Sequence, residues 1–318
     1  MPVALTFPGQ GSQQVGMGRA LADNFTAARS VFDEVDEALG EKLSRLMWEG
    51  PEDKLVLTEN AQPALMAVSM AVVAVLAAEY GLGVARTASF VAGHSLGEYS
   101  ALAAAGTFTL ADTARLLRTR GRAMQAATPV GVGAMAALLG LDVPAAVEVA
   151  REAAQGEVCE AANDNAPGQV VVSGNRAAVE RAVEIAKTKG AKRAVLLPVS
   201  APFHCALMQP AADAMREALG KVTMKAPSVP LVANVTASPL SDPAVIRENL
   251  VKQVTGTVRW RECVSFLADQ NVAVIAELGA GKVLTGMNKR MAPNARCISI
   301  GTPEEIAAAA EALRRKPD

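Results

Sequence analysis

Histidine and paired cysteine are scarce in this chain, which limits the chemistry open to it. Only two histidines occur among 318 residues, and the four cysteines stand far apart without a C-x-x-C pair. The H-E-x-x-H and zinc-finger spacings are absent, so no bound metal is expected. Isolated cysteines without a disulfide pattern are typical of reduced, buried thiols, which predicts a cytoplasmic protein.

Aromatic residues and concentrated charge are also lacking. Only 3% of the residues are aromatic although 51% are hydrophobic, so the core must be built mainly from alanine, valine, leucine and methionine. The 31 basic and 32 acidic residues are spread along the chain and leave a net charge of −1. Without a basic block, neither nucleic acid nor an anionic membrane surface is an expected partner.

The chain has one long uncharged stretch and no recognisable signal peptide. The start, Met1 to Gly11, lacks a basic region and is predicted to form a strand. The uncharged stretch, Asn60 to Ala78, could span a bilayer by length alone, but it is mainly alanine and valine and contains Gln62. We therefore predict a buried helix, capped by Asn60 and with Pro63 in its first turn.

Residues 93–97 carry a motif that is typical of a catalytic nucleophile. Gly93 to Gly97 reads G-H-S-L-G and fits G-x-S-x-G, in which a serine sits on a tight turn between a strand and a helix. An apolar run at 88–92 and helix-forming residues at 96–105 supply that context. The alternative is a buried turn whose serine only caps a helix. The flanking elements favour Ser95 as a nucleophile, with the helix N-terminus helping to stabilise an oxyanion.

Two glycine-rich loops suggest nucleotide binding but do not fit its patterns. The Rossmann pattern starting at Gly9 needs glycine or alanine where Gln14 stands. A P-loop starting at Gly11 meets Met17 in place of lysine, and the loop at 278–282 lacks the first glycine and the Ser/Thr. No nucleotide cofactor is therefore expected from these loops.

The order of predicted elements indicates two parts. Residues 130–199 follow the order βαββαβ, with a turn at 163–168, which is typical of a ferredoxin-like unit. The surrounding strands and helices, together with the serine turn, indicate an α/β fold. We expect an α/β-hydrolase-like large subdomain from residues 1–129 and 200–318, and a ferredoxin-like small subdomain at 130–199 that covers a cleft.

A serine nucleophile needs a base, and only two histidines are available. His94 directly precedes Ser95 on a sharp turn, where consecutive side chains diverge, so it can hardly reach the hydroxyl. His204 is the remaining candidate, at the end of a predicted strand and the start of a helix expected to run to Leu219. Cys205 is an alternative nucleophile. However, it directly follows His204, and because consecutive side chains diverge, its thiol can hardly reach the His204 ring.

A helix predicted from about 109 to 127 carries four arginines. The default interpretation of such a run is a solvated basic face, and we expect it to hold for most of them. The four are Arg115, Arg118, Arg120 and Arg122.

Five motifs make the chain resemble the malonyl-CoA:acyl-carrier-protein transacylases. They occur in the order and spacing of that family, and the resemblance covers essentially the whole chain. The motifs are Pro8–Gln13 (PGQGSQ), Gly93–Glu98 (GHSLGE), Arg120-Gly121, Asn165–Gln169 (NAPGQ) and Phe203-His204. One departure is Thr257, which stands where the family often has proline before V-x-W.

The resemblance implies a role for individual residues. Ser95 would be the acylated nucleophile, His204 the general base and acid, and Arg120 the clamp on the malonyl carboxylate. The resemblance further implies an oxyanion hole from the N–H groups of Gln10 and Leu96. It also implies that the Gln253 carbonyl orients His204 and that Asn163 lines the thioester site.

The activity implied is transfer of a malonyl group from malonyl-CoA to the phosphopantetheine thiol of acyl carrier protein, for fatty-acid synthesis. The expected route is ping-pong through a malonyl-serine, in a monomer without a cofactor. A planar guanidinium suits this task because it grips a carboxylate through two parallel hydrogen bonds. Two alternatives stay open: a serine hydrolase with an acidic third member between Ser95 and His204, and a non-catalytic carrier-docking protein with a relic site.

Overall fold

A six-stranded, mostly parallel sheet forms the centre of the larger part of the protein. The computed structural model describes residues 1–314. The sheet has the order β10-β9-β1-β2-β7-β8, and only β8 runs antiparallel to its neighbour. Its strands are β1 (Val3–Phe7), β2 (Phe90–Gly93), β7 (Leu231–Val232), β8 (Pro239–Leu240), β9 (Val274–Leu278) and β10 (Arg296–Ile300). The predicted α/β class is confirmed.

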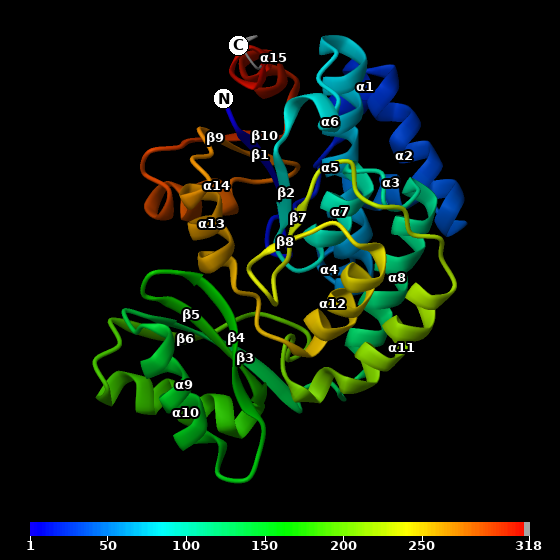
Figure 1. Ribbon diagram of the computed structural model, residues 1–318. Helices are drawn as coiled ribbons and strands as arrows, with labels where there is room; N and C mark the ends of the chain where they lie inside the picture. The colour runs from blue at the N-terminus through cyan, green and yellow to red at the C-terminus, as the bar shows by residue number, and fades with distance from the viewer. Residues whose placement is uncertain (315–318) are drawn as a thin grey trace.

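Both faces of this sheet are covered by helices (Figure 1). Side chains alternate along β1, so Val3, Leu5 and Phe7 pack into one core and Ala4 into the other. The first core is made with α1 (Arg19–Asn24), α2 (Thr26–Leu39), α3 (Leu43–Glu49), α4 (Glu52–Leu55), α5 (Thr58–Tyr80), α6 (Val84–Thr87), α7 (Gly97–Ala104), α8 (Leu110–Ala126), α11 (Gln209–Gly220), α12 (Pro243–Thr255) and α15 (Pro303–Leu313). The second core is made with α13 (Trp260–Asp269) and α14 (Val283–Met291).

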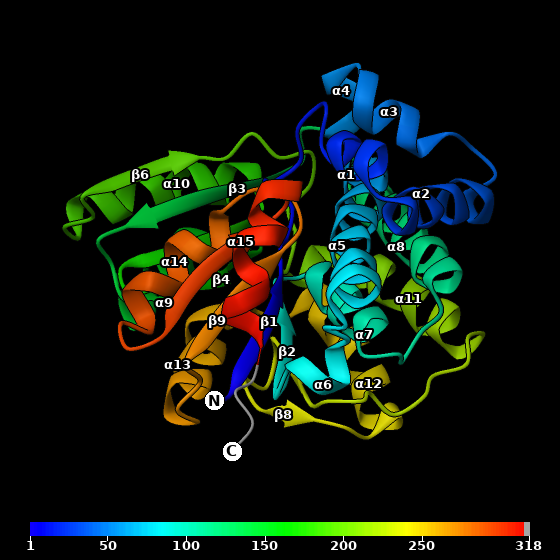
Figure 2. The same cartoon turned by 90° about the horizontal axis from the view of Figure 1, so that it is seen from above.

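A second, antiparallel sheet lies apart from the first and has its own buried core, as the green lobe of Figure 1 shows. Its order is β4-β5-β3-β6, and the elements follow each other as βαββαβ, as predicted. They are β3 (Gly133–Leu139), α9 (Val143–Ala154), β4 (Cys159–Ala166), β5 (Gln169–Asn175), α10 (Arg176–Thr188) and β6 (Arg193–Leu196). Figure 1 shows α9 and α10 side by side on this sheet, and Figure 2 shows α10 along β3 and β6.

Two local predictions are wrong, and both concern site residues. Asn163 was expected in a turn, but β4 continues to Ala166 because two register shifts absorb its polar residues. His204 was expected to begin a helix, but it lies in a loop with φ 58. A short 3₁₀ helix at Ala206–Met208 follows, and α11 starts only at Gln209, with Pro210 in its first turn.

Helix α5 is the uncharged stretch that could span a membrane by length and composition. In its most apolar window, 72% of the residues are buried inside the protein, so it packs as the core helix that the sequence predicts. It starts at Thr58, two residues before the expected cap, because the Leu57 carbonyl accepts from the N–H of Asn60 and Ala61. Asn60 therefore does not cap the helix. At the other end of the chain, the alanine- and glutamate-rich sequence of residues 302–315 predicts a helix, and α15 (Pro303–Leu313) forms there; Arg315 lies outside the described residues.

Candidate active site

The turn that carries Ser95 forms as the motif predicts. β2 ends at Gly93, α7 begins at Gly97, and Ser95 between them has φ 54, a strained conformation for a non-glycine residue. A Cβ on Gly93 would lie 1.9 Å from the Gly97 carbonyl carbon, and one on Gly97 would lie 2.3 Å from the Phe7 oxygen. Only glycine fits at both positions, so the sequence spacing follows directly from the crowding of strand and helix.

The turn places the Ser95 hydroxyl against His204. Ser95 Oγ lies 2.8 Å from His204 Nε2, and His204 Nδ1 lies 2.8 Å from the Gln253 carbonyl oxygen. A carbonyl can only accept, so Nδ1 carries the hydrogen and Nε2 is free to accept from the hydroxyl. The carbonyl belongs to the last turn of α12, where main-chain acceptors lack helical partners. A serine hydroxyl and an imidazole nitrogen that is oriented to accept its hydrogen are therefore in contact.

His204 is held in its neutral form. It is 4% exposed, and burial together with the nearby Arg120 charge lowers its pKa from 6.5 to about 3. A base must be unprotonated to take a proton, so this environment is compatible with the role predicted for His204 at neutral pH.

Arg120 is the one arginine of α8 that reaches Ser95. Its side chain is 1% exposed, and Nη2 lies 3.1 Å from Ser95 Oγ. Nη1 donates to Gln62 Oε1 at 2.8 Å, and Nη2 donates to Gln253 Oε1 at 2.9 Å. The guanidinium also lies 5.7 Å from the centre of the Tyr99 ring. A full positive charge is thus fixed beside the nucleophile.

The glycine after Arg120 lets α8 come close enough for this contact. A Cβ on Gly121 would lie 2.5 Å from the Glu59 Cα and 2.6 Å from the Thr58 oxygen, both at the start of α5. Helix α8 can approach α5 this closely only with glycine at that position. The close packing of α8 against α5 therefore explains why a glycine follows Arg120.

The other arginines of α8 point elsewhere. Arg115 and Arg122 are exposed and pair with Asp112 and Glu59, as expected for a solvated face. Arg118 contradicts that expectation, because it is only 6% exposed and donates to Glu41 and Asn60. It joins the segment before α3 to the start of α5 and has no contact with Ser95.

Sequence reasoning missed a buried polar network beneath the nucleophile. Glu98, 1% exposed, accepts from the Asn234 N–H at 2.5 Å and from Gln253 Nε2. The Asn234 side chain donates to the Gly93 carbonyl at 2.7 Å and accepts from the Ser95 N–H at 2.8 Å. Glu98 stands in the G-x-S-x-G-E run, so it could have been found as an acid in the first turn of a buried helix. Asn234 has no comparable sequence signal.

His94 does not contact the Ser95 hydroxyl. Its Nε2 lies 2.8 Å from Asn165 Oδ1 on β4, and burial lowers its pKa. A Cβ on Gly9 would lie 2.9 Å from His94 Nδ1, so the ring is enclosed by the loop after β1. His94 therefore joins the serine turn to the smaller sheet, in agreement with the prediction that it is not the base.

The remaining predicted residues lie around this centre. Within residues 1–314, the N–H groups of Gln10 and Leu96 donate to no protein acceptor, which leaves them available to an oxyanion. The Gln10 side chain accepts from Thr58 Oγ1 at 2.9 Å. Asn163 is 7% exposed and pairs with Val258, but in the described part of the chain its side chain makes no hydrogen bond to Ser95, His204 or Arg120.

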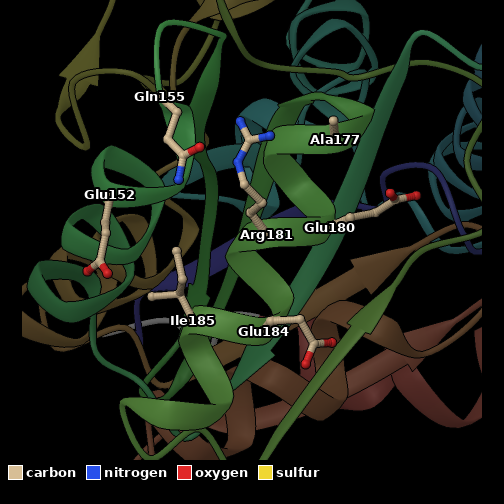
Figure 3. A pocket seen from close by; sticks show the side chains of 7 residues that line it. All are labelled: Glu152, Gln155, Ala177, Glu180, Arg181, Glu184 and Ile185. Atoms are coloured by element: carbon tan, nitrogen blue, oxygen red, sulfur yellow. The ribbon is translucent and has the colours of Figure 1, made fainter.

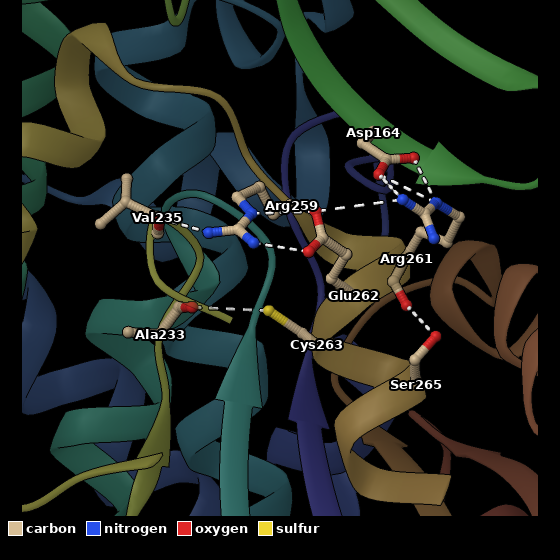
Figure 4. A network of polar contacts seen from close by, with 8 residues as sticks. All are labelled: Asp164, Ala233, Val235, Arg259, Arg261, Glu262, Cys263 and Ser265. Carbon is tan, nitrogen blue, oxygen red and sulfur yellow. Dashed lines mark hydrogen bonds and ion pairs between the residues drawn. The ribbon is translucent and has the colours of Figure 1, made fainter. Parts of the chain in front are cut away.

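A polar network ties the smaller sheet to the larger part (Figure 4). Asp164 on β4, buried at 2% exposure, pairs with Arg261 on α13 at 2.8 Å. The neighbouring Arg259 contacts Glu262 and donates to the Val235 carbonyl at 3.1 Å. The Asp164–Arg261 pair joins β4 to α13, and the Asp164 N–H donates to the Val258 carbonyl at 2.9 Å, which holds β4 next to the segment that follows α12.

A hollow of about 630 Å³ lies away from this centre, on the smaller lobe (Figure 3). It is shallow, and its lining combines Arg181 with the acids Glu152, Glu180 and Glu184. None of the residues gathered around Ser95 lines it. Over residues 1–314, no group of three or more His, Cys, Asp or Glu is placed to hold a metal ion.

Comparison with known proteins agrees with this geometry. Residues 5–305 match the acyl transferase domain family. The malonyl CoA-acyl carrier protein transacylase of Bacillus subtilis is 44% identical over 99% of this chain and 98% of its own. The crystal structure of an acyl-carrier-protein-S-malonyltransferase from Bartonella henselae is 59% identical, with a TM-score of 0.96 over 98% of this chain and 99% of that chain.

A third match comes from a complex. A malonyl-transacylase solved with a type II polyketide acyl-carrier protein is 41% identical, with a TM-score of 0.94 over 98% of this chain and 100% of that one. Three observations lead to the same conclusion. The Ser95 hydroxyl contacts a histidine, a buried arginine lies beside it, and the relatives align over nearly the whole chain. The chain belongs to the acyl transferase family and is an acyltransferase of the malonyl-CoA:acyl-carrier-protein transacylase type.

Proposed function

We propose that this protein transfers the malonyl group of malonyl-CoA to the phosphopantetheine thiol of acyl carrier protein, supplying units for fatty-acid synthesis. The observation that carries the proposal is the buried Arg120 guanidinium 3.1 Å from the Ser95 hydroxyl, which itself contacts His204. A general esterase has no use for a fixed cation at that distance, whereas an acyl group ending in a carboxylate does.

The proposed route has two transfers through a malonyl-serine. As Ser95 Oγ attacks the thioester carbon, its proton passes to His204 Nε2, which then protonates the departing coenzyme A thiol. In the second half, Nε2 takes the proton of the pantetheine thiol, whose sulfur attacks the ester, and Ser95 Oγ leaves with that proton. Gln253 keeps the ring in place through its carbonyl.

The oxyanion formed in each half needs donors. The unused N–H groups of Gln10 and Leu96 support that role, since Leu96 directly follows the nucleophile and Gln10 lies in the loop after β1. We place Asn163 beside the thioester on the strength of the family resemblance, as its position on β4 next to Val258 allows.

The malonyl carboxylate is proposed to bind Arg120. Gln62 takes one N–H of Nη1, and Gln253 takes one N–H of Nη2. One N–H on each terminal nitrogen remains, if the weak contact to Ser95 is released. Two parallel donors are what bidentate recognition of a carboxylate requires.

We further propose the division into an α/β-hydrolase-like part (1–129 and 200–318) and a ferredoxin-like part (130–199). Separate sheets support it, and so does the core that the smaller sheet forms with α9 and α10; the other face of that sheet packs against the larger core through Met135, Ala162 and Val171. The smaller part would keep water from the acyl-serine. The protein is proposed to act as a cytoplasmic monomer without a cofactor, with malonyl-CoA and acyl carrier protein as its partners.

A serine hydrolase is the alternative, and one observation disfavours it. Such enzymes orient the histidine with a carboxylate, whereas His204 Nδ1 here meets the Gln253 main-chain carbonyl. Intact-mass measurement after incubation with malonyl-, methylmalonyl- and acetyl-CoA tests the proposal. A covalent malonyl adduct formed faster than the other two supports it, and equal or absent labelling refutes it.

A further inference from the structure

Glu98 is a buried acid to which the proposed reaction steps give no task. It lies in the first turn of α7 and is 1% exposed. Its Oε1 accepts from the Asn234 N–H at 2.5 Å, and its Oε2 accepts from Gln253 Nε2. Burying an acid is costly unless its oxygens are paired, so both contacts matter to its position.

Gln253 connects Glu98 to Arg120. Its Oε1 accepts from Arg120 Nη2 at 2.9 Å, while Nε2 donates to the Ser95 carbonyl at 2.9 Å and to Glu98. Arginine can only donate, and the Ser95 carbonyl can only accept. A flipped amide would therefore set donor against donor at Arg120 and acceptor against acceptor at Glu98.

We propose that Glu98 is a positioning residue: it fixes the side-chain amide of Gln253, which in turn holds the Arg120 guanidinium where the acyl carboxylate binds. The inference rests on the proposed function for the identity of that carboxylate. Glu98 itself touches no substrate, and its effect reaches the reaction only through Gln253 and Arg120.

Replacing Glu98 with glutamine tests this with almost no change in shape. A carboxylate accepts at both oxygens, but an amide accepts at one end and donates at the other. In Glu98→Gln, either orientation must set an NH₂ group against the Asn234 N–H or against Gln253 Nε2. The substitution weakens the contact that orients the Gln253 amide, while the volume of the side chain at position 98 is preserved.

A matched control exists on β9. Glu277 is also fully buried, and its carboxylate accepts from the N–H groups of Leu284 (3.1 Å) and Thr285 (2.7 Å), away from Ser95. Glu277→Gln should lower the melting temperature as much as Glu98→Gln does, but it should leave the acyl preference unchanged. A merely structural role for Glu98 would make the two variants alike.

The expected result is a loss of malonyl preference. Measured at pH 9, above the pKa of about 8 to which burial raises Glu98, kcat/KM for malonyl-CoA should fall about tenfold in Glu98→Gln, the lower range for one hydrogen bond to a charged group, while that for acetyl-CoA changes far less. In a Gln253→Met background, which lacks the amide, Glu98→Gln should shift the ratio little further. An unchanged malonyl-to-acetyl ratio in Glu98→Gln, or an additive effect in the double variant, overturns the proposal.

The pH dependence gives a second readout. Burial raises the pKa of Glu98 to about 8, and the ionised form offers one acceptor more than the protonated form. The charged or titratable groups facing it are Arg120, Tyr99 and Cys263. Arg120 keeps its proton. Burial raises the pKa of Tyr99 to about 12, and burial also raises the pKa of the Cys263 thiol far above its ordinary value, so both stay neutral between pH 7 and 9. Malonyl preference should therefore rise from pH 7 to 9 in the wild type and stay flat in Glu98→Gln.

A crystal structure of Glu98→Gln separates this inference from the proposed function. Arg120 Nη2 and Gln253 Oε1, 2.9 Å apart in the wild type, should no longer be in contact. An unmoved pair contradicts the role of Glu98 whatever the substrate. If wild-type protein takes up no malonyl group, the proposed function fails, and this structure still decides the role of Glu98.

Discussion

Replacing Arg120 with alanine should change which acyl group the enzyme prefers. The guanidinium is buried against Gln62, Gln253 and Ser95, and one N–H on each terminal nitrogen becomes available to a carboxylate when the contact between Nη2 and Ser95 is released. Acetyl-CoA has no carboxylate to bind there. In Arg120→Ala, kcat/KM should therefore fall for malonyl-CoA, whereas kcat/KM for acetyl-CoA should stay similar or rise as the buried charge disappears.

The size of the effect follows from the two hydrogen bonds. A hydrogen bond to a charged group contributes roughly 1.5–3 kcal/mol, so two partly coupled bonds give about 2–4 kcal/mol. That corresponds to a roughly 30- to 1,000-fold loss in kcat/KM for malonyl-CoA. Arg120→Lys should recover only part of it, because an ammonium cannot present two parallel donors.

The assay is the malonyl-to-acetyl ratio of kcat/KM, with circular dichroism as the check on folding. Arg115→Ala and Arg122→Ala are the controls, because both side chains are exposed on the same helix; Arg115 contacts Asp112 and the Ala38 carbonyl, and Arg122 contacts Glu59. Arg118 is unsuitable, since it is buried and bonded to Glu41. An unchanged ratio in Arg120→Ala, or an equal collapse in either control, would mean that the carboxylate is held elsewhere.

Further predictions test the nucleophile, the base and the helix contact. Ser95→Ala should form no acyl-enzyme, and a full malonyl mass shift in that variant would refute the assignment. His204→Ala should lose far more activity than His94→Ala, and the reverse order in folded variants would refute the choice of base. Because burial lowers the pKa of His204 to about 3, malonyl-enzyme formation should persist as pH falls below 6.5, and an acid limb centred near 6.5 would count against it. Gly121→Ala should lower stability by about 1–3 kcal/mol in urea unfolding, since its Cβ would meet α5 at 2.5 Å, and an unchanged midpoint would show that the helices can separate.

The serine turn was predictable from sequence because its motif is local: a glycine lies two residues before and two residues after Ser95, and the strand and helix on either side carry ordinary signals. The reason for Gly93 is also local, since a Cβ there would meet Gly97, whereas Gly97 is required by the distant Phe7 carbonyl. The choice of His204 over His94 also followed from sequence, since adjacent side chains on a sharp turn diverge. The order βαββαβ was readable for the same reason, because helix caps and strand patterns mark each element.

What sequence could not supply depends on contacts between distant segments. Asn234 reaches Gly93 and Ser95 across 141 and 139 positions, and nothing near it in the chain marks it. His204 departs from the expected helix because its ring must meet Ser95, which places it at φ 58 in a loop. Arg118 resembles its neighbours in sequence, and its burial and its contacts with Glu41 and Asn60 distinguish it only in the structure.

The most direct test of the central claim is a two-step transfer followed by intact mass. Protein incubated with malonyl-CoA and freed of excess donor should carry one malonyl group on Ser95, located by peptide mapping. Addition of acyl carrier protein bearing phosphopantetheine should remove that group and place it on the carrier. A protein that never becomes labelled, or that releases free malonate at the same rate with and without carrier, would contradict the account.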